Sequence, residues 1–172
     1  MPDACPIWSL RDLYEGIDSP AVQTDIATCR KAALALAADW QGKIATISGA
    51  ELAVVITAYE TILEQLGKVQ SHAQLLFAAN TNDPAIAKHH QSVREAGSEI
   101  GAALLFVELE LARLDQDHVD SLLDDAGLAR FSPWLRRVRA MAPYQLCDEI
   151  EKRIAERAPT GAGAGVRLFD ET

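Results

Sequence analysis

The chain has 172 residues, of which 49% are hydrophobic and 24% charged, and its formal net charge is −9. This length and composition are typical of one globular domain with a substantial core. The acidic balance argues against nucleic acid and against anionic lipid as partners, and no stretch of about 18 uninterrupted apolar residues predicts a membrane-spanning helix.

The first residues predict an arm that packs on the body of the protein. Large apolar and polar residues alternate without a helical stripe, which favours an extended segment over residues 1–18. We expect four of its side chains to lie on the body: Trp8, Leu10, Leu13 and Tyr14.

Three long amphipathic segments then predict helices. Ser19 and Pro20 are typical of a helix start, and an apolar stripe continues to about Trp40, with Gly42 ending the helix. Ser48 and Glu51 form the pattern of a capping box ahead of a second stripe. The turn at 80–84 leads into a third stripe that reaches Leu114. Because two segments of about thirty residues are joined by a short turn, they should form an antiparallel hairpin.

Shorter helices are predicted after this hairpin. A fourth begins near Asp115 and ends at Gly127, a fifth begins at Ser132 and is broken by Pro143, and a last one covers about 147–158. The sequence contains no strand pattern of any length. It therefore predicts an all-α antiparallel helical bundle, with the arm at 1–18, a helical lobe at 19–158, and a flexible glycine-rich link with the start of a truncated following element at 159–172. In the third helix, Gly97 and Gly101 should let a neighbouring helix approach closely.

The histidines do not form a recognised metal motif. A zinc protease helix needs His-Glu-x-x-His, and none of His72, His89, His90 and His118 begins one. His89 and His90 are adjacent, so they should point about 100° apart on a helix and not share a metal. We interpret all four as ordinary surface and interface histidines.

Other candidate groups also favour structural roles. Glu108 and Glu110 lack the Glu-x-x-His context of ferritin-like metal sites and are expected to be solvated carboxylates. The run from Gly161 to Gly165 resembles a phosphate-binding loop, but it has no preceding strand and no following Gly-Lys-Ser/Thr, which favours a flexible link. The sequence therefore predicts no catalytic, metal-binding or cofactor-binding residue in this chain.

The cysteines and a basic cluster complete the candidates. Cys147 is expected at a helix N-terminus but has no nearby histidine, so catalysis by its thiol is not expected. Cys5, Cys29 and Cys147 are odd in number and far apart, and no signal peptide precedes them, which favours a reducing cytoplasm. The arginines at 136, 137 and 139 are expected to form a surface face that pairs with carboxylates.

Four segments, taken in order, resemble a known family. The segment 8–14 is similar to the Trp-x-Leu-x-Asp-Leu-Tyr opening of oligoendopeptidase F-type zinc metallopeptidases, relatives of thimet oligopeptidase. The segment 75–84 resembles the hairpin turn of that family, and 106–111 resembles the end of its third helix. Residues 158–171 resemble its Ser-Pro-Thr-Gly…Trp-x-Arg-Leu-Phe-Asp-Glu segment, although Val166 stands where the family has tryptophan.

The resemblance implies a function that the residues alone do not disclose. In that family this region is a non-catalytic helical lobe, and a later catalytic lobe carries His-Glu-x-x-His with zinc. Short peptides enter a channel between the lobes. The resemblance thus implies one wall of that channel, with the catalytic lobe and short peptides as partners and no zinc ligand in this chain.

Two further expectations concern the whole chain. Because Val166, Leu168 and Phe169 follow the glycine run without an obvious packing partner, the chain reads as a fragment cut where a new element begins. An isolated lobe would expose the face that its missing half covers, so it should self-associate, for example as a homodimer. The alternative is a stand-alone helical protein–protein interaction module that binds a partner helix along the hairpin.

Overall fold

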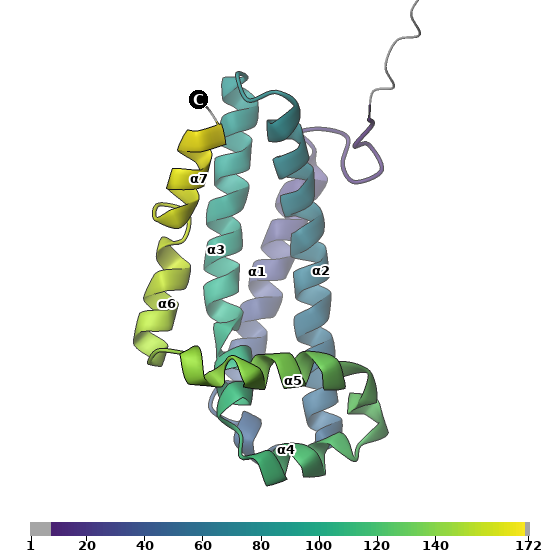
Figure 1. Cartoon of the computed structure of the whole chain (residues 1–172). Coiled ribbons are helices and arrows are strands. Elements are labelled where there is room, and N and C mark those ends of the chain that lie inside the picture. The colour runs from purple at the N-terminus through teal and green to yellow at the C-terminus, as the bar shows by residue number, and fades with distance from the viewer. Residues whose placement is uncertain (1–7, 171–172) are drawn as a thin grey trace, which may run out of the picture.

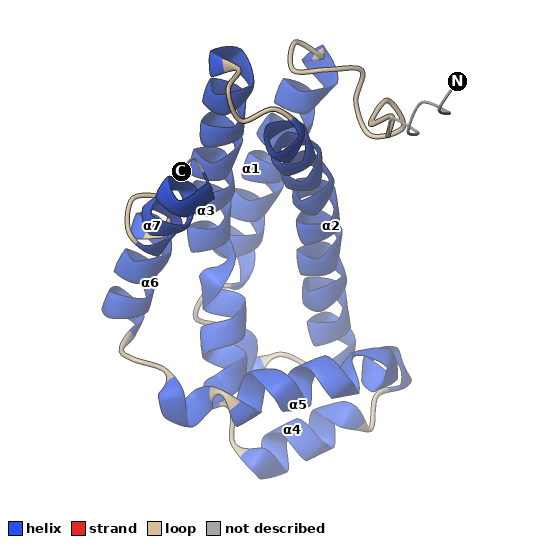
Figure 2. Ribbon diagram, turned by 45° about the horizontal axis from the view of Figure 1, so that its top comes forward, coloured by secondary structure: helices blue, strands red, loops and turns tan. Residues whose placement is uncertain are grey.

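The computed structural model describes residues 8–170, and every regular element within that range is helical (Figure 2). The predicted all-α class is confirmed. The positions 1–7 and 171–172 lie outside the described residues, and with them Cys5 and the end of the predicted terminal segment. Among the described residues, none of the helices combines the length and the apolar character needed to cross a membrane.

Three long helices form the body of the molecule (Figure 1). They are α1 (Pro20–Trp40), α2 (Gly49–Ala79) and α3 (Pro84–Arg113), and each packs against the other two. The short 3₁₀ segment η1 (Ile44–Thr46) connects α1 to α2, and a turn after Ala79 connects α2 to α3. The buried core runs along the faces where these helices meet, and its largest fully buried side chains include Leu52, Ile56, Ile100, Leu104 and Leu111.

Two of the three long helices begin at side-chain caps, whereas Ser19, the cap expected for α1, makes no side-chain capping hydrogen bond and Pro20 is the first helical residue. The Ser48 side chain accepts a hydrogen bond from the Glu51 amide, and the Glu51 carboxylate accepts one from the Ser48 amide, which is the predicted capping box. The Asp83 carboxylate accepts from the amides of Ala85 and Ile86 at the start of α3. Each cap satisfies amides that the first turn of a helix leaves without a partner.

Shorter elements close one end of the bundle and return along its side. The helices α4 (Gln116–Leu123) and α5 (Ser132–Ala140) cross the base, joined by η2 (Ala126–Phe131). After η3 (Ala142–Tyr144), the helices α6 (Asp148–Arg157) and α7 (Ala162–Asp170) lie along α3. The fourth helix ends earlier than the predicted Gly127, because the Asp125 side chain accepts from the Gly127 amide and starts a tighter 3₁₀ segment.

Two local predictions are wrong. The predicted flexible link contains α7. The turn at Gly161 leads directly into this helix, and the alanines at 162 and 164 favour the helical conformation. The guanidinium of Arg94 on α3 also lies where a side chain at Gly163 would sit. In the arm, Tyr14 is buried, but Trp8 is 89% exposed, because it precedes the turn at 10–14 that brings Tyr14 onto the bundle.

Candidate functional site

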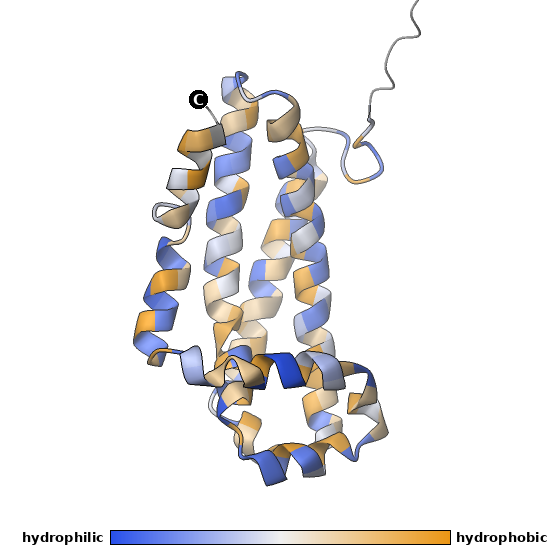
Figure 3. Ribbon diagram, viewed as in Figure 1, coloured by the Kyte–Doolittle hydropathy of each residue, from blue (hydrophilic) through white to orange (hydrophobic). Residues whose placement is uncertain are grey.

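An outer apolar face is the first candidate surface. It consists of Met141, Tyr144, Leu146, Ile150 and Ile154, all exposed. Ile150 and Ile154 are four residues apart on α6 and share one side of that helix, and Leu146 directly precedes the helix. Figure 3 shows apolar positions recurring along α6 and α7. Apolar side chains grouped in this way commonly mark an interaction site.

Two polar contacts fix α6 on α3 and leave this face outward. The Ser98 hydroxyl donates to the carbonyl of Ala155 at 2.7 Å, and the Arg113 guanidinium pairs with the Asp148 carboxylate at the start of α6. Asp148 is exposed, and its hydrogen bond with Arg113 lowers its pKa. The opposite side of α6 therefore faces α3, and the apolar face remains available for another surface.

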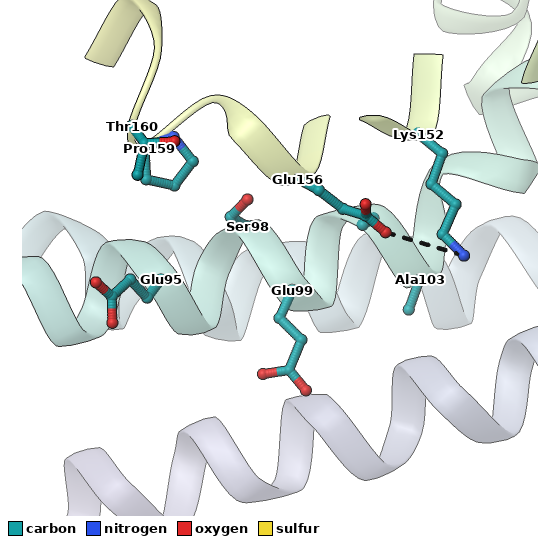
Figure 4. Close-up of a pocket in the computed structure, with 9 residues that line it drawn as sticks. Glu95, Ser98, Glu99, Ala103, Lys152, Glu156, Pro159 and Thr160 are labelled. Carbon is teal, nitrogen blue, oxygen red and sulfur yellow. Dashed lines mark ion pairs between the residues drawn. The ribbon is translucent and has the colours of Figure 1, made fainter. Parts of the chain in front are cut away.

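A shallow acidic groove lies between α3 and α6 (Figure 4). The carboxylates of Glu95 and Glu99 point away from α6, whereas Glu156 pairs with Lys152 at 4.0 Å. The Arg30 side chain of α1 hydrogen-bonds to Glu99 at 2.9 Å and lowers the pKa of that carboxyl. Because these acids do not converge on one point, the groove does not provide a set of metal ligands.

A second groove runs between α2 and the base and has an aromatic lining. It encloses about 650 Å³, and its lining includes Leu63, Phe131 and Trp134. The rings of Tyr59 and Trp134 lie 5.7 Å apart between centroids. An ion pair between Glu60 and Arg130 of 2.8 Å lies at its edge. Apolar and aromatic walls with a few polar groups are typical of ligand grooves.

The carboxylates singled out in the sequence are structural acceptors. Glu110 accepts hydrogen bonds from the amides of Gly42 at 2.7 Å and Ile44 at 3.3 Å. Glu108 accepts from the hydroxyl of Tyr59 at 2.9 Å. The expectation of merely solvated carboxylates is therefore wrong, because both side chains bond to other elements. Sequence reasoning missed these roles since the partners are about fifty or more positions away.

The histidines do not assemble into one site. His90 stacks on Phe77 with ring centroids 4.6 Å apart, whereas His89 faces His72 at 6.2 Å. The two neighbours thus point to different partners, as the helical spacing predicts. His72 and His90 are buried, however, and are not surface residues. Within residues 8–170, no group of three or more histidines, cysteines or acids is placed to hold a metal ion.

The remaining candidates lie apart from one another. Cys147 is the N-cap residue of α6 and is exposed, as its predicted position implies, and Cys29 is buried in the core. Arg139 does not pair with a carboxylate as predicted: it donates to the carbonyl of Leu114 and to the side-chain oxygen of Gln116. Its partners are the polar groups left between the end of α3 and the start of α4.

The glycines of α3 have unequal roles. Gly97 is buried, and a side chain there would meet the end of Gln70 on α2. A side chain at Gly101 would meet nothing within 4 Å. Close approach is therefore limited to Gly97.

Comparison with known proteins finds a family match for the carboxy-terminal part of the chain. Residues 110–172 match the family model described as Oligopeptidase F. The predicted resemblance to an oligoendopeptidase F-type amino-terminal region is confirmed. This oligopeptidase F region includes α4 to α7 and the outer apolar face. No curated protein and no solved structure matches the chain.

Proposed function

We propose that this chain is the non-catalytic helical lobe of a zinc-dependent oligopeptidase that hydrolyses short peptides, and that it forms one wall of the substrate channel. The observation that carries the proposal is the oligopeptidase F match over residues 110–172. The chemistry would reside in a separate catalytic lobe, to which we assign the zinc ion. Zinc there would activate the attacking water.

The outer apolar face is the surface we assign to contact with that catalytic lobe. It lies within the matched residues and combines exposed apolar side chains with a flanking polar rim. The rim includes the ion pairs Lys152–Glu156 and Arg153–Glu149. Interfaces between domains have this composition, with an apolar centre and charged residues at the edge.

We assign contact with peptides to the aromatic groove between α2 and the base. An aromatic lining binds apolar peptide side chains without strong sequence preference, which suits a wall that admits varied short peptides. The exposed Glu60–Arg130 pair would offer one charge of each sign at the edge. The proposed compartment is the reducing cytoplasm, supported by the cysteine usage and by the thiols of Cys29 and Cys147, which are not joined in a disulfide.

Peptide hydrolysis tests the non-catalytic assignment. The purified chain is incubated with a mixture of internally quenched fluorogenic short peptides, with and without added zinc. We expect no cleavage in either case. Zinc-dependent cleavage that co-purifies with the chain through a second, orthogonal chromatography step would overturn the proposal.

Tryptophan fluorescence tests the groove separately. Trp134 lines the groove, whereas Trp40 packs against the core of the bundle. Short apolar peptides should change the emission of the wild-type chain and of Trp40→Phe, and Trp134→Phe should lose that response. A response that persists in Trp134→Phe, or no response at millimolar peptide, would contradict the groove assignment and leave the hydrolysis result untouched.

The alternative function is a stand-alone helical interaction module, and the exposed outer apolar face is the observation that favours it. The reading frame of the source gene distinguishes the two functions. A frame that continues to a His-Glu-x-x-His helix supports the oligopeptidase lobe, and a stop codon directly after Thr172 supports the module.

A further inference from the structure

Two histidines face each other inside the bundle between α2 and α3. The His72 side chain is 1% exposed, and its ring meets that of His89 nearly at right angles, with centroids 6.2 Å apart. Nδ1 of His72 and Nε2 of His89 are shielded from solvent and have no hydrogen-bond partner within residues 8–170. Adding a proton to either nitrogen would bury a charge at an atom that has no hydrogen-bond acceptor among the described residues.

The same pair supports the amino-terminal segment 8–19. Tyr14 is the buried anchor of this segment, and its ring meets the edge of His72 at 5.2 Å. The backbone of Tyr14 also acts on His72, in the direction that raises the pKa of the imidazole. The turn that precedes the anchor is short, with the amides of Leu13 and Tyr14 both donating to the carbonyl of Leu10. The contact of the Tyr14 ring with His72 is therefore one of the attachments that hold this segment on the bundle.

Charged and titratable groups surround the pair from every packed element. From α1, Asp25 accepts a hydrogen bond from the Tyr14 hydroxyl at 2.7 Å, and Cys29 lies near that hydroxyl. From α2, the Lys68 ammonium lies 4.7 Å from the Tyr14 ring centroid. From the segment itself, Asp18 acts on His89. Protonation of His72 would thus add a second positive charge near the Lys68 ammonium, which already lies over the Tyr14 ring.

The environment favours the neutral form of both rings. Burial lowers the pKa of His72, and the neighbouring His89 lowers it further, while the Tyr14 backbone acts in the opposite direction. Burial also lowers the pKa of His89, partly offset by Asp18. In an opened state the pKa of each ring would return toward the ordinary histidine value of about 6.5.

We propose that His72 and His89 form a pH-sensitive latch: protonation of this pair in mildly acidic solution releases residues 8–19 from the helical bundle. Because the pKa values are lower in the closed state, the closed state binds fewer protons than the open one. The stability that the neutral histidines give the closed state is fully present above about pH 6.5. It decreases as the pH falls toward the lowered pKa values. The release is a local opening, since the long helices keep their own core contacts.

Amide hydrogen exchange of the full chain tests the latch. Rates are measured for Leu13 and Tyr14 at about pH 7.5 and about pH 5.5 and corrected for the intrinsic pH dependence of exchange. We expect protection of these two amides to fall on acidification, because the closed state binds fewer protons than the open one. Amides in the centre of α2 should keep their protection.

Paired variants distinguish the latch from general acid sensitivity. His72→Phe with His89→Phe keeps apolar rings in place and removes both titrating groups, so protection should no longer depend on pH. His118→Gln is the matched control, since Nε2 of His118 is also shielded and without a partner but lies in α4 at the base. This control should retain the wild-type response.

Direct titration of the rings keeps the test independent of the double variant's folding. The imidazole resonances of His72 and His89 in the wild-type chain should titrate below the ordinary histidine pKa, together with the opening of residues 8–19. The proposal is overturned if Leu13 and Tyr14 stay equally protected at both pH values. It is also overturned if the rings titrate at the ordinary value, or if the folded double variant still opens in acid.

Discussion

At the scale of single residues, Glu110 holds the connection between α1 and α2 against α3. Gly42 adopts a φ of 81°, a conformation that L side chains rarely adopt, and this turns its amide toward the Glu110 carboxylate. The Ile44 amide donates to the other carboxylate oxygen, and the Ile44 side chain is fully buried. One acidic side chain therefore satisfies two loop amides and fixes the position of a core residue.

Removal of this carboxylate should destabilise the fold. Glu110→Ala leaves two amides without their acceptor, and we expect a loss of about 1–3 kcal/mol in the free energy of unfolding. Chemical denaturation followed by circular dichroism measures it. Glu149→Ala is the control, because that exposed carboxylate pairs with Arg153 one turn away in the same helix and should change stability by about 0.5 kcal/mol or less. Equal effects of the two substitutions would contradict the role assigned to Glu110.

At the scale of elements, the capping box at Ser48 fixes where α2 begins. The Ser48 hydroxyl accepts from the Glu51 amide, and the Glu51 carboxylate accepts from the Ser48 amide. Both bonds lie just before Leu52, the first buried residue of the helix. Ser48→Ala should therefore lower the free energy of unfolding by about 1 kcal/mol. Ser71→Ala places the same substitution at an exposed site within the same helix, where alanine is favoured, and should leave stability equal or slightly higher. Thermal unfolding of both variants measures these changes in stability.

Local signals explain which elements could be predicted from the sequence. Ser48 and Asp83 bond to amides two or three positions away, so residue type and spacing already define these helix starts. The role of Glu110 could not be predicted, because its partners at Gly42 and Ile44 approach only when α1 and α3 pack. The helical state of the glycine run likewise involves Arg94, which is distant in the sequence. The family motifs could be recognised, but no spacing in the sequence places His72 under Tyr14.

At the scale of the whole molecule, the core and the outer apolar face have different requirements. The three long helices bury their stripes against one another, so the bundle does not depend on another surface. By contrast, Ile150 and Ile154 stay exposed on α6, a helix with no buried residue of its own, and Leu146 stays exposed just before it. Water contact at these side chains costs about 25 cal/mol for each Å² of apolar surface that a partner could cover. We therefore expect the isolated chain to bury this face against a second copy of itself.

The charges of α6 favour an antiparallel pairing of two such faces. Its first turn carries Asp148, Glu149 and Glu151, and its last turn carries Arg157. Two antiparallel α6 helices would thus place the acidic first turn of each beside the later part of the other, where Lys152, Arg153 and Arg157 outnumber Glu156. Sedimentation should show concentration-dependent self-association of the wild-type chain that weakens at high salt, since salt screens these exposed charges.

Substitution on the face should abolish this association. Ile150→Lys with Ile154→Lys buries two ammonium groups in the paired state, and we expect a monomer at concentrations where the wild-type chain associates. Val54→Lys is the matched control, because Val54 is as exposed as these isoleucines but lies on α2. A wild-type chain that remains monomeric at high concentration would contradict self-association. If Val54→Lys also prevented association, the contact could no longer be assigned to α6.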